Sequence, residues 1–273
     1  MPAQPAIAIT TDIDALSART LGTGNSRDQE TSPMASSFGK LTLICLEIPW
    51  TEDFGQDADF TPECAVAPYL DAFAVNSGIR FLLRHVHTRD DWSRWCRGLK
   101  HKRLGRRVHW VAAHGDGKGN KAHIDLLPTR GKKGAAALFP KDIKGGLAVA
   151  GKLDGVIIDA CDFGRNDPAT WLPGKNTTFP RWALAFDRPV LWTDSTFFAL
   201  KTLEWLFETN PSLPTTSAHA ARRFKDGVVK GRVKKRSERV DLSAWAAALG
   251  ARFYYRKQNK GWDVICFPQP PGA

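Results

Sequence analysis

A histidine and a cysteine in this sequence form a pair that can perform nucleophilic catalysis. His114 ends the apolar run in VHWVAAHGDG (108–117), and Cys161 ends the run in DGVIIDACDFG (154–164). A cysteine attacks a carbonyl as its thiolate, and a neighbouring imidazole removes the thiol proton and later returns it to the leaving amine. The pair predicts covalent attack on a carbonyl, provided that the fold brings the two residues together.

Such an attack also needs hydrogen-bond donors for the carbonyl oxygen, which becomes negatively charged, and backbone N–H groups can supply them. Gly115 follows His114 directly, and because glycine has no Cβ, a substrate carbonyl can approach its N–H closely. The N–H of Cys161 is the second candidate donor. Gly115 and Cys161 therefore predict an oxyanion site beside the catalytic pair.

The elements that must position these residues are strands and helices in alternation. Apolar runs predict strands over 41–50, 79–87, 106–115, 154–161 and 188–195, and helical patterns cover 64–78, 88–105, part of 138–152 and 195–211. This order predicts an α/β fold with a mostly parallel central sheet and helices on both faces. Sites in such sheets form at the carboxyl ends of the strands. His114 and Cys161 are therefore expected at one edge, although 47 residues separate them.

The cysteines indicate a reducing compartment. There are five, an odd number, and no two are close in sequence: Cys45, Cys64, Cys96, Cys161 and Cys266. This spacing argues against a disulfide framework and against a zinc site built from cysteine pairs, so a cytoplasmic location is expected. His85 and His87 lie two residues apart on a predicted strand without an evident third ligand, and His123 is expected only to border the His114 loop. No metal and no other cofactor is predicted.

Size and charge suggest how the chain is organised. The 273 residues, 42% of them hydrophobic, suffice for a large core, and no apolar run approaches the ~20 residues of a membrane span. Residues 1–38 are expected to be a disordered leader, and 39–212 the α/β domain. The net charge is +11, and residues 221–260 alone hold thirteen Lys and Arg against three acidic residues. Residues 213–273 form a basic segment that either completes the domain or is appended to it.

The basic segment has two interpretations. Residues 221–240, with Phe253, Tyr254 and Tyr255 nearby, could bind nucleic acid, because Lys and Arg contact phosphates and aromatic rings stack on bases. Charge runs are more often a solvated surface or a linker, and no nucleic-acid-binding motif is recognisable here. Nucleic acid is therefore the less favoured partner.

Residues 108–115 and 155–164 together resemble the caspase-like cysteine peptidases, a group that includes caspases, metacaspases, legumains and CHAT-domain proteins. In that group one strand ends in His-Gly and a later strand ends in the cysteine, with the histidine roughly 50 residues upstream. The resemblance extends over about 41–210. It implies a caspase-like three-layer sandwich and a cysteine endopeptidase in which His114 and Cys161 are catalytic. A protein or peptide would be the substrate.

Asp159-Ala160-Cys161 followed by Gly164 is closest to the metacaspase pattern Asp-x-Cys-x-x-Gly. In that branch the acid two positions before the nucleophile selects a substrate Arg or Lys, so the resemblance implies this role for Asp159. Trp192 and Asp194 are implied as secondary pocket residues. The family analogy also suggests a regulatory protein partner and a role in bacterial stress or defence signalling. The sequence departs from the metacaspase pattern in the Gly-Asp-Gly after His114 and in Asp162 after Cys161.

Less specific interpretations of the same residues remain open. Cys161 taken alone is most simply a buried structural cysteine, and Asp159 could cap the next segment or accept a hydrogen bond from a backbone amide. The whole protein could then be a catalytically idle scaffold, or an adaptor that binds nucleic acid through 221–240. The separation of the Cys161 sulfur from the His114 ring would distinguish the two alternatives.

Overall fold

The structure is a computed structural model that describes nine ranges of residues. These are 41–48, 66–100, 104–117, 121–126, 137–174, 177–207, 216–230, 242–257 and 261–268. All of them belong to one compact unit, Ser36–Ala273. The predicted leader 1–38 and residues 231–240 of the basic segment lie outside the described residues.

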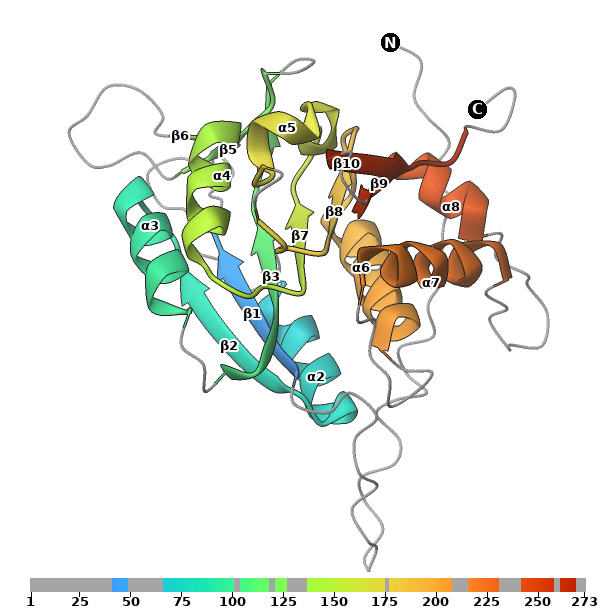
Figure 1. The fold of residues 1–273 in the computed structure, drawn as a ribbon, viewed down its shortest axis with the longest axis horizontal. Coiled ribbons are helices and arrows are strands. Elements are labelled where there is room, and N and C mark those ends of the chain that lie inside the picture. The colour runs from blue at the N-terminus through green and yellow to red at the C-terminus, as the bar shows by residue number, and fades with distance from the viewer. Residues whose placement is uncertain are drawn as a thin grey trace, which may run out of the picture. The chain divides into compact units, whose positions relative to one another are not determined.

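A seven-stranded sheet forms the centre of the described part of the chain (Figure 1). Its order is β10 (Gly261–Ile265), β9 (Ala251–Lys257), β8 (Trp182–Phe186), β7 (Gly155–Asp159), β3 (Arg106–Ala112), β1 (Leu41–Glu47) and β2 (Arg80–His85). The five strands from β8 to β2 run parallel, whereas β9 and β10 are antiparallel to their neighbours. The prediction of a mostly parallel α/β sheet is therefore confirmed.

Helices cover both faces of this sheet. One face packs against α2 (Ala67–Ser77), α6 (Trp192–Phe207), α7 (Ser217–Lys230) and α8 (Leu242–Ala248), and the other against α3 (Arg89–Gly98), α4 (Pro140–Val149) and the short α5 (Pro168–Trp171). Each face of the sheet has its own hydrophobic core, and alternate residues of a strand pack into one or the other. In β1, Leu43 and Cys45 face one side, and Ile44 and Leu46 face the other. Because both faces are buried, the inner strands are continuous apolar runs.

The helix predicted over 88–105 illustrates how local sequence sets an element. Thr88 is its N-cap and forms a capping box with Asp91, whose carboxylate accepts from the Thr88 backbone N–H at 3.1 Å. α3 then ends at Gly98, seven residues before the predicted end. The capping residues therefore make the start of this helix predictable from the sequence. Its end is less well defined.

The strand predicted over 188–195 is wrong. The fifth parallel strand is β8, which ends at Phe186, and α6 begins at Trp192. Pro189 lacks the N–H that a strand of an inner sheet must donate, so the apolar residues after it form a connecting segment instead. The connection after β7 contains a 3-10 turn, η4 (Phe163–Arg165), and the short helix α5.

The predicted strand 106–115 is divided in two. β3 ends at Ala112, and residues Gly115–Asp116 form β4, which pairs antiparallel with β5 (His123–Asp125). β5 pairs in turn with β6 (Ala137–Leu138), so a small three-stranded sheet continues from the end of β3. No helix in the described ranges is both long and apolar enough to cross a membrane.

β9 and β10 extend the sheet on its β8 side, with Leu184 opposite Phe253 in the register. The buried Tyr254 of β9 donates from its hydroxyl to the Gly164 carbonyl at 2.7 Å, directly below the segment that follows Cys161. This hydrogen bond connects the C-terminal strands to the connection after β7. The domain boundary near residue 212 stays a prediction.

We expect Tyr254→Phe to lower the free energy of unfolding by about 1–3 kcal/mol, because it leaves a buried carbonyl without its donor. The matched control is Tyr255→Phe. Tyr255 lies next to it on β9, and its hydroxyl donates to Asp263 at a partly exposed position. That variant should lose less than about 1 kcal/mol. Urea denaturation of the three proteins measures the difference, and equal losses would contradict a specific role for the Tyr254 hydrogen bond.

Candidate active site

The candidate site begins where two neighbouring parallel strands end. β3 and β7 pair in register up to Ala112 and Asp159, and one further bond runs from the Ala113 N–H to the Asp159 carbonyl at 3.1 Å. Both chains then leave the sheet at the same edge, one into His114-Gly115 and the other into Ala160-Cys161. The structure thus places the two predicted catalytic residues at the shared carboxyl edge of the sheet.

Gly115 and Cys161 are in direct backbone contact. A Cβ built on Gly115 would overlap the Cys161 carbonyl oxygen and would lie 2.8 Å from the Cys161 nitrogen, closer than a real methyl group can approach. The residue before it, His114, is exposed, and its carbonyl accepts from the Asp125 N–H at 3.1 Å. The backbone of His114 is therefore held between Cys161 on one side and β5 on the other.

The N–H of Gly115 is not used in the pairing of β4 with β5. The bond from Asp125 to His114 flanks the Gly115–Ile124 pair, which makes it a non-hydrogen-bonded pair of the antiparallel ladder. The Gly115 N–H consequently does not point at β5. This geometry suits the oxyanion role predicted for Gly115.

Cys161 is half-buried, and its sulfur lies against the segment after β8. The Val190 N–H is 3.5 Å from Sγ, and Sγ is 3.6 Å from the Val190 carbonyl oxygen. Burial raises the pKa of the Cys161 thiol, and the nearby charges of Asp162 and Asp159 raise it further, against the lowering effect of the Val190 hydrogen bond. The thiol is therefore protonated at neutral pH in this structure, and attack requires a base.

Asp159 is buried beneath the site. Its carboxylate accepts from Thr196 Oγ1 of α6 at 2.9 Å and from Trp110 Nε1 of β3 at 3.3 Å. Burial raises the pKa of Asp159 to about 6, and hydrogen bonds from Ser195, Thr196 and Trp110 oppose this rise. The carboxylate thus joins β7, β3 and the first turns of α6.

Trp192 and Asp194 lie in the first turn of α6, just after the segment that contacts the Cys161 sulfur. The half-buried ring of Trp192 meets Tyr69 of α2 edge to face at 5.5 Å between centroids, and Tyr69 meets Phe197 at 5.7 Å. Burial raises the pKa of Asp194. Tyr69 and Val190 carry no signal in the sequence, because one lies on a helix face and the other in a stretch predicted as strand.

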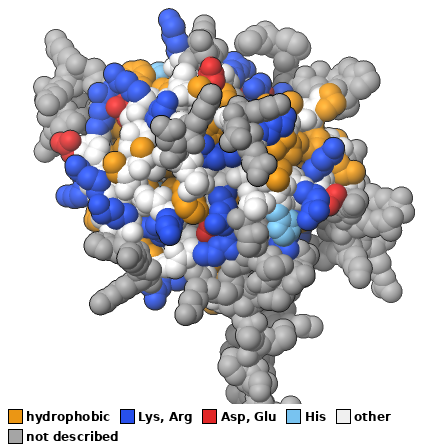
Figure 2. Space-filling model, in the orientation of Figure 1, with side chains coloured by type: hydrophobic (Ala, Val, Ile, Leu, Met, Phe, Trp, Pro, Cys, Tyr) orange, Lys and Arg blue, Asp and Glu red, His pale blue; other side chains and the backbone are white. Residues whose placement is uncertain are grey.

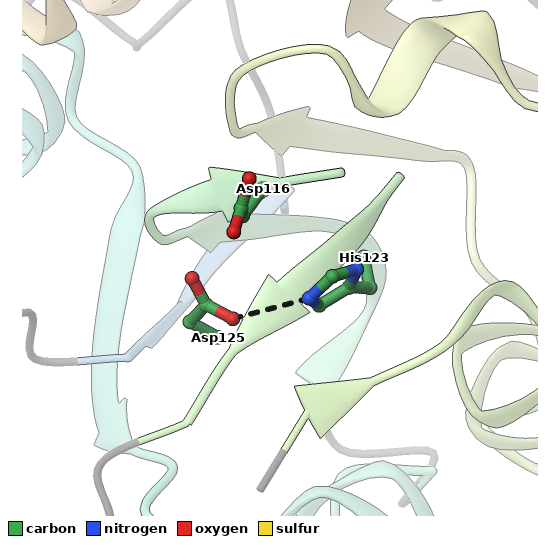
Figure 3. A group of neighbouring side chains, drawn as sticks. All are labelled: Asp116, His123 and Asp125. Atoms are coloured by element: carbon green, nitrogen blue, oxygen red, sulfur yellow. Dashed lines mark ion pairs between the residues drawn. The ribbon is translucent and has the colours of Figure 1, made fainter. Parts of the chain in front are cut away.

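One group of three potential metal ligands occurs among the residues that the structure describes: Asp116, His123 and Asp125. They lie on β4 and β5, directly after His114 in the chain (Figure 3). The sequence alone predicts no metal ligands, because strands of two and three residues give no periodic signal that would pair them.

No protein-family model and no curated protein matches this chain. Solved structures do. A secreted C11 cysteine protease from Bacteroides thetaiotaomicron, in complex with an irreversible peptide inhibitor, matches at 10% identity and TM-score 0.42, over 80% of this chain and 66% of that one. The Drosophila initiator caspase Dronc matches at 9% identity and TM-score 0.45, over 90% and 89%.

The Raptor protein of Chaetomium thermophilum also matches, at 11% identity and TM-score 0.37, over 67% of this chain and 20% of that one. The chain thus spans just under two thirds of the C11 protease and a fifth of Raptor. The identities are near 10% and the TM-scores lie below 0.5, so the chemistry of the candidate site follows from its own residues alone.

Gly115→Ala should destabilise the protein by about 1–3 kcal/mol, because the added methyl meets the Cys161 backbone and the edge of the sheet must shift. Gly145→Ala is the matched control. Gly145 lies exposed within α4 with nothing near its missing Cβ, so this change should raise stability by up to about 1 kcal/mol. Chemical denaturation compares the two variants. Equal stability of Gly115→Ala and the unmodified protein would contradict the close packing.

Asp159→Asn should change how stability depends on pH. The pKa of Asp159 is about 6, above its ordinary value of 3.8, so the folded protein holds this proton more tightly than the unfolded chain. Stability contributed by the protonated carboxyl is complete below about pH 3.8 and is lost as the pH rises through 6. Asparagine carries no charge. The variant should therefore gain on the unmodified protein by up to roughly 3 kcal/mol between pH 4 and pH 7.

Thermal or urea unfolding at a series of pH values measures this gain. Asp71→Asn, which removes a carboxylate at an exposed position of α2, is the matched control. A constant difference for Asp159→Asn across the pH range would show that the Asp159 carboxyl has an ordinary pKa.

Proposed function

We propose that this protein is a cysteine endopeptidase that uses Cys161 as nucleophile and His114 as general base, then acid. The backbone contact between Gly115 and Cys161 at the common edge of β3 and β7 carries the proposal. It supports a site in which histidine, glycine and cysteine adjoin one another although they are far apart in sequence. A protein or peptide is the proposed substrate, and no cofactor takes part.

The residues would act in the following order. His114 removes the proton from the Cys161 thiol as the sulfur attacks the scissile carbonyl, and the N–H groups of Gly115 and Cys161 stabilise the resulting oxyanion. His114 then gives its proton to the leaving amine, which leaves a thioester on Cys161. Water, activated by His114, hydrolyses the thioester. Because the resting thiol is protonated, His114 must accept this proton at the moment of attack.

We further propose cleavage after Arg or Lys, selected by Asp159. The support is a buried carboxylate two residues before the nucleophile, at the end of the same strand. A guanidinium forms charge-assisted, often bidentate hydrogen bonds with a carboxylate, and such bonds gain strength away from water. Trp192 and Asp194 would line the same pocket from the first turn of α6. The preference should weaken below about pH 6, where Asp159 becomes protonated.

A cytoplasmic location, a regulatory protein partner and a role in bacterial stress or defence signalling remain part of this proposal by family analogy. A raised thiol pKa fits an enzyme that is latent until a partner or substrate rearranges the Val190 segment against the sulfur.

A second candidate is a catalytically idle caspase-like scaffold that binds nucleic acid. Figure 2 shows Lys and Arg side chains distributed over the viewed face of the molecule, with few acidic ones between them. On α7, Arg222 and Lys225 are exposed, whereas Phe224 and Val228 are buried. The first half of the segment 221–240 is thus an amphipathic helix with a basic outer face, which is also what a solvated surface helix looks like.

The experiment that tests the peptidase proposal combines turnover with labelling. Fluorogenic peptides with Arg, Lys, Asp or Leu at the cleaved position are incubated with the unmodified protein, with Cys161→Ala and with His114→Ala. We expect turnover of the Arg and Lys peptides and a loss of at least about 10³-fold in either variant. Cys266→Ala, which removes an exposed cysteine, is the matched control and should keep full turnover.

A latent enzyme is detected with a peptide that carries Arg and a thiol-reactive group at the cleaved position. Mass spectrometry should find the label on Cys161, and only weakly on the exposed Cys266. Labelling of Cys161 by a Leu peptide in preference to the Arg peptide would keep the nucleophile and reject the role of Asp159. Equal labelling of both cysteines by every peptide, without turnover, would favour the idle scaffold.

A further inference from the structure

Three potential metal ligands converge on one face of the β4–β5 hairpin (Figure 3). Asp116 and His123 are direct partners in the antiparallel register, and Asp125 lies two residues after His123, so all three side chains leave the same face. One ligand atom from each lies within 4.8 Å of the others. Asp116 is exposed, and the His123 and Asp125 side chains are about a quarter exposed, at 24% and 30%.

The His123 ring is oriented as a metal ligand would be. Its Nδ1 lies 3.3 Å from the Lys121 carbonyl oxygen, and because a carbonyl can only accept, the neutral ring carries its proton on Nδ1. The lone pair then resides on Nε2, which faces Asp125 Oδ1 at 3.3 Å. Metal-binding histidines usually donate their other N–H to a carbonyl or carboxylate in this way.

Nε2 of His123 and Oδ1 of Asp125 therefore face each other. Two ligands at about 2.0–2.1 Å from a tetrahedral ion are separated by roughly 3.3 Å, the spacing observed here. Asp116 adds a second carboxylate, and one of its oxygens accepts from the Gly117 N–H at 2.5 Å. An ion between the three groups would supply the positive charge that this set of acceptors needs.

Arg89, which lies over the Phe139 ring, is engaged with other groups. Phe139 packs on the His123 ring at 5.4 Å between centroids, and the Arg89 guanidinium carbon lies 5.4 Å from the centroid of the Phe139 ring. Arg89 donates to the Ala137 carbonyl at 2.8 Å and lies 3.7 Å from Asp142. Its charge is thus directed to α4 and β6 rather than to the cluster.

We propose that Asp116, His123 and Asp125 bind a divalent transition-metal ion, Zn²⁺ being the best fit. One imidazole nitrogen and two carboxylate oxygens are a borderline ligand set, which suits Zn²⁺, whereas Ca²⁺ prefers six to eight oxygens. Water completes the coordination on the exposed side. The inference does not rest on the proposed peptidase activity, since the ligands are distinct from Cys161 and His114.

The test is zinc binding to the full-length Cys161→Ala protein, in which the thiol of the candidate dyad cannot bind the ion. Metal-free protein is titrated with Zn²⁺ against a chromophoric chelator, in the presence of a non-thiol reductant. We expect one ion per chain. His123→Ala should weaken binding by at least about tenfold, and Asp125→Asn, which preserves shape, should weaken it as well.

The matched control is His87→Ala, which removes an exposed histidine that packs against another histidine, His85, outside the hairpin. It should bind zinc as tightly as its parent. Circular dichroism confirms that each variant is folded. Absence of zinc binding, equal binding by His123→Ala and its parent, or tighter binding of Ca²⁺ than of Zn²⁺ would each overturn the proposal.

Discussion

The backbone contact between Gly115 and Cys161 is the constraint on which the candidate site depends. Beyond the last hydrogen bond of the β3–β7 ladder, two chains that leave parallel strands would normally diverge into separate loops. Here they stay in van der Waals contact, because one of them presents a glycine to the other's peptide group. Because His114 directly precedes Gly115, this contact keeps the backbone of the histidine close to that of the cysteine.

Asp159 shows that this edge of the sheet is not optimised for stability alone. An asparagine could accept the same hydrogen bonds from Trp110 and Thr196 without the penalty of burying a charge, which raises the pKa of Asp159 to about 6. A costly buried carboxylate beside a candidate nucleophile is more readily explained by function than by packing. The same charge also raises the pKa of the Cys161 thiol, so a bound cation from a substrate would relieve both groups at once.

Much of the fold could be predicted because the parallel strands are long apolar runs separated by helices with clear caps, as at Thr88. The edge position of His114 and Cys161 followed from that order. The stretch 188–195 could not be placed, because Val190 and Leu191 have the composition of a strand and only Pro189 argues against one. The Asp116–His123 pairing was equally hidden, since register between strands of two and three residues depends on neighbours that sequence does not reveal.

The β4–β5 hairpin links the two sites that we propose. Asp125 donates its N–H to the His114 carbonyl and contributes its carboxylate to the metal-ligand cluster, so one residue touches both. An ion that orders the hairpin would lower the conformational entropy that His114 still has to lose when substrate binds. Because linkage is reciprocal, a substrate that orders His114 would in turn tighten the metal site. The two sites therefore share one short element and should not act independently.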